Sequence, residues 1–339
     1  VSSKFHALVE TIKTNLFTFF DEADIVIAHN ICSLHKNLAL TAALYQISNE
    51  HRHPRLILWH HDLAWTTPRY RAELHEGYPW DLLRISWQAV RHVVVSEARQ
   101  HELAKLMNLD KDLIQVIPNG VETRQLFKLE TQTVELVTRM NLDAADPFLL
   151  LPVRLTSRKN IELALRVLAA LRHEFPNAML VVTGPEGPHN PANADYKEML
   201  LRLRHSLGLQ GAAHFLAEYT TEFLPDAVVA DFFRLADALL MPSREEGFGI
   251  PLIEAALTRL PIFCADIPPL RALGGTDISL FSPDANPSDV ADLITTRLRT
   301  DKVYRFAARA KRTYTWERIY TASIAPLLEA ASPESAKGA

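Results

Sequence analysis

The chain has 339 residues, 48% of them apolar and 22% charged, so it can form buried cores, favours two domains and is not a disordered chain. Its formal net charge of −4 gives no global attraction to nucleic acid or to an anionic bilayer. Glycine is scarce, with 11 residues, and only Gly77 precedes Gly120. The first third therefore lacks the glycine-rich loop that holds phosphate in many α/β proteins.

Cysteine and hydropathy patterns indicate the compartment. Cys32 and Cys264 lie in apolar runs far apart in the sequence, which favours buried thiols in a reducing environment over a disulfide or a zinc site. No apolar run reaches the roughly 18 residues of a membrane span, and the N-terminus has no signal-peptide pattern. The cytoplasm is the expected location, and attachment to the inner face of the membrane stays open.

Short β-rich runs alternate with helical patterns along the chain, which predicts parallel sheets with crossover helices. The strands predicted in the first part are Asp24–His29, Leu56–His61, His92–Ser96 and Ile114–Ile117. The strands predicted after residue 146 are Phe148–Arg154, Ala178–Thr183, Ala213–Leu216, Ala238–Met241, Pro261–Ala265 and Ile278–Phe281.

A Pro-Asn-Gly turn at residues 118–120 and a polar stretch after it separate the two series. The predicted division is an N-terminal domain over 1–122, a link over 123–146, a second domain over 147–315, and a final helix with a polar tail over 316–339. Two doubly wound domains in tandem direct the carboxyl ends of both sheets toward a shared cleft, where ligands of such sheets bind.

The densest motif, PSREEGFGIPLIEA, runs from Pro242 to Ala255. It follows a predicted strand, bends at two glycines and starts a helix near Pro251, so backbone N–H groups and the positive end of the helix dipole favour phosphate there. Glu246 and Glu254 can accept hydrogen bonds from sugar hydroxyls, and the combination suits a nucleotide sugar. The alternative is that both carboxylates are solvated charges at a helix end.

A second motif, PVRLTSRKNIE, covers the end of the first strand of the second domain and the turn after it. Arg154 closes the strand and Lys159 opens the next helix, so both cations are predicted at the carboxyl edge of the sheet. A guanidinium binds a diphosphate bidentately and an ammonium neutralises it. A solvated basic turn is the alternative.

The motifs EGFGIPLIEA, RLTSRKN and IPNGVE occur in this chain in the order and spacing of the retaining glycosyltransferases of family 4, which the sequence resembles from about Asp24 to its end. The resemblance implies the GT-B fold, an α/β fold with two Rossmann-like parallel-sheet domains that face a cleft. It implies that the helix around Trp316 crosses back to the first domain. It also implies an incomplete N-terminal domain, because the glycine-rich loop that relatives carry after their first strand is missing.

The resemblance assigns roles to the candidate residues of the second domain. Arg154 and Lys159 would bind the donor diphosphate. Glu254 would bind the nucleotide ribose, and Glu246, as a catalytic residue, the hydroxyls of the transferred sugar. Backbone contacts to the donor are implied for Gly247, Phe248 and Gly249.

Residues at strand ends of the first domain are the candidates for the acceptor side. Similar family members have a His-Asp pair near the transferred sugar, which His61 and Asp62 match as catalytic candidates. His29 ends another predicted strand. The aromatic-rich connection after the pair offers Arg69 and Tyr78 to an acceptor, since aromatic faces stack on sugar rings. The alternative is a loop packed by its own aromatic side chains.

These assignments predict transfer of a hexose from a UDP-, GDP- or ADP-hexose to a hydroxyl acceptor, with retention of the anomeric configuration. The alternative is a non-catalytic relative that only binds a nucleotide sugar. Adjacent residues of a strand, such as His60 and His61, point to opposite faces and make poor co-ligands, so neither an obligatory cofactor nor a metal site is expected.

No nucleic acid partner is expected, and peripheral membrane contact stays open because some relatives act on lipid acceptors. An incomplete first domain would leave the donor site largely intact and weaken transfer.

Overall fold

The computed structural model describes residues 1–50, 55–185, 191–220 and 223–331, which form two compact units. The first unit contains residues 1–121 and the chain from 314 onward, and the second contains residues 122–313. The polar tail predicted at the end of the chain lies outside the described residues from 332 on.

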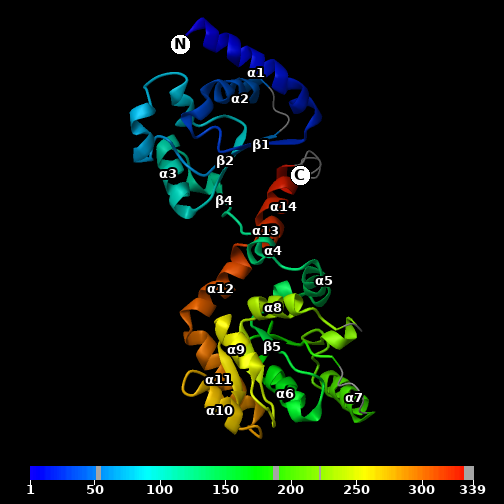
Figure 1. Ribbon diagram of the computed structural model, residues 1–339. Coiled ribbons are helices and arrows are strands. Elements are labelled where there is room, and N and C mark those ends of the chain that lie inside the picture. The colour runs from blue at the N-terminus through cyan, green and yellow to red at the C-terminus, as the bar shows by residue number, and fades with distance from the viewer. Residues whose placement is uncertain (51–54, 186–190, 221–222, 332–339) are drawn as a thin grey trace. The chain divides into compact units, whose positions relative to one another are not determined.

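The first unit has a parallel four-stranded sheet in the order β1-β2-β3-β4 (Figure 1). Its strands are β1 (Ile25–His29), β2 (Arg55–His60), β3 (Val90–Val94) and β4 (Ile114–Val116). Its helices are α1 (Ser3–Glu22), α2 (Leu38–Glu50), α3 (Glu97–Met107), α13 (Trp316–Ile319) and α14 (Ala325–Ala331), with a π-helical turn, η8 (Tyr320–Ile324), before the last. α1 packs against α2, and both contribute to one apolar cluster with the sheet.

The last helices of the chain belong to the core of the first unit. Ile319 of α13 and Leu327 of α14 are buried in one cluster with Trp59 of β2. A side chain at Gly120 would place its Cβ 2.6 Å from the ring of Trp316, so only glycine permits this close approach. The chain therefore returns to the first sheet after the second unit is complete.

The second unit has a parallel six-stranded sheet in the order β10-β9-β8-β5-β6-β7. Its strands are β5 (Phe148–Leu151), β6 (Met179–Val182), β7 (Ala213–Phe215), β8 (Ala238–Met241), β9 (Ile262–Ala265) and β10 (Ser279–Phe281). Its helices are α4 (Thr123–Phe127), α5 (Thr131–Met140), α6 (Ile161–Leu171), α7 (Pro191–Ser206), α8 (Asp226–Leu235), α9 (Ile250–Leu257), α10 (Pro268–Gly274), α11 (Pro287–Thr300) and α12 (Lys302–Thr313).

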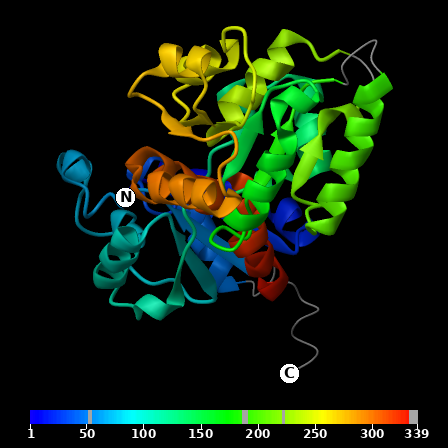
Figure 2. The ribbon, with the colours of Figure 1, turned by 90° about the horizontal axis from the view of Figure 1, so that it is seen from below.

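Helices cover both faces of this sheet (Figure 2). Every residue of its central strands is therefore buried. α6 packs against α7 and α11, while α8 packs against α5 and α9 against α10. All ten predicted strands are present, with ends that differ by up to three residues. The predicted fold class, two parallel α/β sheets, is confirmed.

The segment predicted as a link, residues 123–146, is instead part of the second unit. Helix α5 buries Leu136 and Met140 in the main core. The buried carboxylate of Asp231 accepts a hydrogen bond from Thr133 Oγ1 at 2.6 Å and another from a backbone N–H at the start of α5. These contacts fix the helix to α8.

Both cysteines are free and buried, as the sequence predicts. Burial raises the pKa of each thiol, Cys32 and Cys264, to about 12, so both are neutral at physiological pH and neither is a reactive thiolate.

Candidate functional site

The order of the six-stranded sheet places a switch point between β5 and β8. From β5 the chain proceeds outward through β6 and β7, then returns to β8 on the other side and proceeds through β9 and β10. The connections after β5 and β8 therefore diverge, and in open α/β sheets ligands bind at the carboxyl ends of such strands. The two sequence motifs occupy these two connections.

The two connections are tied together by hydrogen bonds. Arg244 N donates to Arg158 O at 2.8 Å, and the Asn160 amide donates to the carbonyl of Pro242 at 3.1 Å. Asn160 is buried and has a φ of 52°, in the left-handed region that asparagine tolerates better than most residues. Asn160 was not among the predicted site residues, because its amide binds carbonyl groups that lie far away in the sequence.

Lys159 and Glu246 meet at this point. Lys159 Nζ lies 2.6 Å from Glu246 Oε1, and each side chain is only 9% exposed. The sequence places both residues at this edge, and the structure shows that they pair. A cation and a carboxylate held together out of water cancel each other until a ligand supplies new partners.

Arg154 and Glu254 line one cavity of about 470 Å³, which we name the carboxyl-edge cavity. Its other lining residues follow β5, β6 and β7 or lie on and before α8: Pro152, Val153, Thr183, Gly184, Pro185, Leu216, Ala217, Thr220, Phe223, Leu224, Asp226 and Val229. Arg154 has no carboxylate partner within the described chain. The cavity is therefore lined by one cation without an acidic partner in the described chain, that of Arg154, and mostly by apolar side chains.

The carboxylate of Glu254 is perturbed by its position in α9. Partial burial raises its pKa, and the nearby carboxylate of Asp226 adds to the effect. Two carboxylates thus lie beside one cavity, of which the sequence analysis identified only Glu254.

Glycines allow the backbone to approach closely around this site. A Cβ at Gly184 would lie 2.2 Å from the carbonyl oxygen of Val153. The loop after β6 therefore needs glycine at this position to approach the chain after β5 so closely. Gly249 caps α9 with a φ of 102°, and a Cβ there would lie 2.7 Å from Leu270. The predicted loop over 182–190 is described only up to residue 185.

The backbone before α9 offers donors. The N–H groups of Gly247, Phe248 and Gly249 have no acceptor in the described chain. Pro251, in the first turn of the helix, has no N–H group and so needs no acceptor. The ring of Phe248 is 58% exposed, so it is not held by the core.

In the first unit, the ends of β1 and β2 bring His29 and His61 into contact through their Nε2 atoms, at 2.5 Å. The backbone of Asn30 has a φ of 57°. Its side-chain oxygen accepts hydrogen bonds from the backbone N–H groups of His61 and Asp62. Burial lowers the pKa of His61, and a charge on His29 lowers it further, while Asp62 opposes the shift. The lowered pKa favours the neutral form of the His61 imidazole.

Asp62 lies between two guanidinium groups. Arg69 approaches one carboxylate oxygen at 3.4 Å and Arg99 approaches the other at 3.5 Å. Tyr78 is placed elsewhere, because its ring stacks on His6 of α1. The structure thus gathers His29, His61, Asp62 and Arg69 into one cluster and does not show Tyr78 in contact with it.

His60 points to the other face of β2, as expected for adjacent strand residues. Its Nε2 lies 3.1 Å from Nδ1 of His92 in β3, and both rings are buried. Burial, together with the charges of His92 and His61, lowers the pKa of His60 to about 3, and burial lowers the pKa of His92 to about 4. This pair is a neutral, buried contact, separate from the cluster around His61.

Two family models match the sequence. The model described as glycosyl transferases group 1 matches residues 137–313, and the model described as glycosyltransferase family 4 matches residues 4–125. The first match lies in the second unit, and the second match covers most of the first unit.

Curated relatives match parts of the chain at 24% to 31% sequence identity. It is 24% identical over 282 residues to a mannosylglucosylglycerate synthase of Petrotoga mobilis, covering 77% of this chain and 63% of that protein. It is 31% identical over 151 residues to the serotype-specific mannosyltransferase WbdA of Escherichia coli, covering 44% of the chain and 17% of that protein. It is 26% identical to a D-inositol 3-phosphate glycosyltransferase of Jonesia denitrificans, covering 70% and 56%. The chain therefore spans less than two thirds of the length of these relatives.

Solved structures match over most of the chain. The Anabaena protein Alr3699/HepE in complex with UDP-glucose is 19% identical, with a TM-score of 0.43, and the match covers 95% of this chain and 82% of that one. Sucrose-phosphate synthase from Thermosynechococcus elongatus is 17% identical, with a TM-score of 0.42, over 97% and 80%. Among the described residues, no helix has the length and apolar composition that crossing a bilayer demands.

Proposed function

This chain belongs to the glycosyl transferases group 1 family, and we propose that it transfers a hexose from a nucleoside diphosphate sugar to a hydroxyl acceptor. The observation that carries the proposal is the arrangement at the switch point of the second unit. Arg154 and Glu254 line one cavity there, and the Lys159–Glu246 pair joins the two connections beside it.

In this proposal the carboxyl-edge cavity holds the nucleotide of the donor. Arg154 lacks a carboxylate partner in the described chain, so it is available to bind the diphosphate bidentately. Glu254 accepts hydrogen bonds from the ribose hydroxyls. The apolar wall that includes Leu216 and Val229 faces the base. No divalent ion is needed in this scheme, because the cations and the backbone N–H groups before α9 meet the charge of the phosphates.

The Lys159–Glu246 pair would act on the reacting part of the donor. Glu246 accepts hydrogen bonds from hydroxyls of the hexose, and Lys159 stabilises the charge that grows on the leaving diphosphate. Because both groups are almost fully buried, their electrostatic effect on a bound phosphate is stronger than that of surface charges.

We assign the acceptor side to the strand ends of the first unit. The lowered pKa of His61 favours the neutral imidazole, which can hydrogen-bond a hydroxyl, while Asp62 is held by Arg69 and Arg99. Retention of configuration follows if the acceptor hydroxyl attacks from the face that the diphosphate leaves, with the leaving phosphate taking the proton.

The test is a transfer assay with UDP-, GDP- and ADP-hexoses, with the anomer of the product assigned by NMR. We expect Lys159→Ala and Glu246→Ala each to lower kcat/KM about 100-fold or more for the donor that the parent uses best. The matched controls are Arg166→Ala, on the exposed face of α6, and Glu245→Ala, the exposed neighbour of Glu246; both should stay within a few-fold of the parent.

Variants of Lys159 and Glu246 that keep parental transfer rates would rule out these roles. An inverted product would reject retention and leave the donor site standing. Calorimetric binding of a nucleotide with no transfer to any acceptor would exclude catalysis by this chain.

A further inference from the structure

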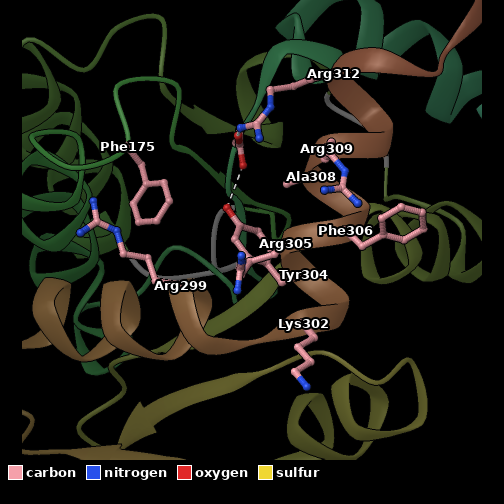
Figure 3. Close-up of a pocket in the computed structure, with 10 residues that line it drawn as sticks. Phe175, Arg299, Lys302, Tyr304, Arg305, Phe306, Ala308, Arg309 and Arg312 are labelled. Atoms are coloured by element: carbon pink, nitrogen blue, oxygen red, sulfur yellow. Dashed lines mark hydrogen bonds and ion pairs between the residues drawn. The ribbon is translucent and has the colours of Figure 1, made fainter. Parts of the chain in front are cut away.

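The second unit has another cavity, of about 570 Å³, which we name the amino-edge cavity (Figure 3). Ten residues line it: Asp146, Phe175, Arg299, Lys302, Tyr304, Arg305, Phe306, Ala308, Arg309 and Arg312. Asp146 lies two residues before β5 and Phe175 lies four residues before β6, so this cavity lies at the amino edge of the sheet. The carboxyl-edge cavity lies past the other ends of the same strands, and the two share no residue.

The lining of the amino-edge cavity is strongly basic. It holds five cationic side chains and one carboxylate, that of Asp146. The carboxylate is already engaged, because Asp146 accepts a hydrogen bond from the hydroxyl of Tyr304 at 2.7 Å through one oxygen and pairs with Arg312 through the other. Asp146 therefore cannot neutralise the remaining cations.

Three of the cations have no carboxylate partner in the part of the chain that the structure describes. Arg299 pairs with Glu174 at 2.5 Å, whereas Lys302, Arg305 and Arg309 pair with no acid. The guanidinium of Arg309 lies over the ring of the exposed Phe306, 5.0 Å from its centre.

These three cations form one stripe along α12. Their spacing of three and four residues puts them on the same side of the helix, while Tyr304 and Ala308 bury the opposite side in the core. Like charges at this spacing repel each other. The stripe extends for roughly 10 Å, given a rise of about 1.5 Å per residue, which exceeds the size of one phosphate.

The walls of the cavity are fixed by packing. The guanidinium of Arg299 lies 5.7 Å from the centre of the Phe175 ring, and Figure 3 shows these two side chains beside each other, opposite the residues of α12. The anion-binding groups are thus presented by one helix whose buried side is tied to the sheet through Tyr304 and Asp146.

We propose that the amino-edge cavity binds a ligand with two or more phosphate groups, at a site separate from that of the donor nucleotide. Guanidinium groups bind phosphate bidentately, and several phosphates along the stripe would relieve the repulsion among its cations. A free polyphosphorylated compound and a phosphorylated lipid headgroup both carry this chemistry.

The test uses the full chain and titrates tripolyphosphate by calorimetry at low and at physiological salt. The triple variant Lys302→Ala, Arg305→Ala, Arg309→Ala should bind tripolyphosphate at least tenfold more weakly. A control triple, Lys105→Ala, Arg166→Ala, Arg202→Ala, removes the same charge from exposed faces of other helices and should bind like the parent. Circular dichroism and the affinity for UDP should be unchanged in both, which shows that the fold and the carboxyl-edge cavity survive.

Sedimentation with vesicles distinguishes the two sources of phosphate. Vesicles of phosphatidylcholine with about 5% phosphatidylinositol 4,5-bisphosphate that bind the parent and not the triple variant, where phosphatidylglycerol vesicles of matched charge bind neither, would identify a headgroup ligand. Tripolyphosphate binding without vesicle binding would identify a free ligand. The proposal is overturned if the parent binds neither probe, or if the control triple loses as much affinity as the stripe variant.

Discussion

The ion pair of Lys159 and Glu246 shows what single residues contribute to this molecule. Sequence patterns predicted both residues at one sheet edge, because each follows the end of a predicted strand. They did not predict that the ammonium and the carboxylate lie 2.6 Å apart and are largely removed from water. Such a pair costs desolvation energy that only its own partner offsets, so its integrity bears on stability as well as on function.

We expect Lys159→Met and Glu246→Gln each to lower the free energy of unfolding by about 3 kcal/mol, because each leaves one buried polar group without its partner. The double variant should lose less than the sum, with a coupling energy of about 2 kcal/mol in urea unfolding. The exposed pair Arg202–Glu198 is the control and should couple by less than about 0.5 kcal/mol. Additive losses at the buried pair would contradict the contact.

Gly184 is the second residue with a sharp steric prediction. In Gly184→Ala the new Cβ would meet the Val153 carbonyl oxygen at 2.2 Å, so the backbone beside the carboxyl-edge cavity must shift. We expect a loss of about 2 kcal/mol or more in unfolding free energy and at least tenfold weaker UDP binding. Gly211→Ala, where a Cβ meets nothing within 4 Å, should change stability by less than about 0.5 kcal/mol. Equal behaviour of the two variants would refute the close approach.

At the scale of elements, apolar runs predicted every strand, since buried parallel strands need continuous apolar sequence. Helix α5 was missed as an element of the second unit, although Thr133, Leu136, Val137 and Met140 repeat at helical spacing. Its many polar residues resemble a link, and only the packing partner on α8 identifies the buried side.

The buried pair of His60 in β2 and His92 in β3 makes a prediction about pH. Both folded-state pKa values lie well below the ordinary value of 6.5, at about 3 and about 4. The unfolded chain therefore binds more protons than the folded one below pH 6.5, and stability falls as the pH decreases from 6.5 toward 4. At pH 5 the expected loss is about 2 kcal/mol for each histidine.

Urea unfolding of the first unit at several pH values measures this effect. Replacing both residues, in His60→Leu with His92→Leu, should flatten the decline between pH 6.5 and 5. The exposed His101→Gln should leave it unchanged. A decline of the same steepness in the double variant would mean that other groups cause it.

At the scale of the whole molecule, the chain forms two units, and the first is completed only by residues that follow the second. All five tryptophans of the sequence, at 59, 65, 80, 87 and 316, belong to the first unit, so tryptophan fluorescence reports on that unit alone. The proposed nucleotide site belongs entirely to the second unit.

A nucleotide that binds the second unit should therefore stabilise one unit selectively. At about 100 times its dissociation constant, UDP would raise the free energy of unfolding of the second unit by about 2.7 kcal/mol. Calorimetry should show one transition moving to higher temperature, while the fluorescence transition stays in place. An equal shift of the fluorescence transition would show that the two units unfold as one.

The sequence by itself determined the strands, the two parallel sheets, the motif residues at the second sheet's carboxyl edge and the family, because these depend on local apolar runs and short patterns. The tertiary structure decided which side chains meet. Lys159 and Glu246 are 87 residues apart, and His29 and His61 are 32 apart. The order of strands in each sheet sets these encounters and the separation of the two cavities, and strand order is a property of packing between distant segments that no local pattern encodes.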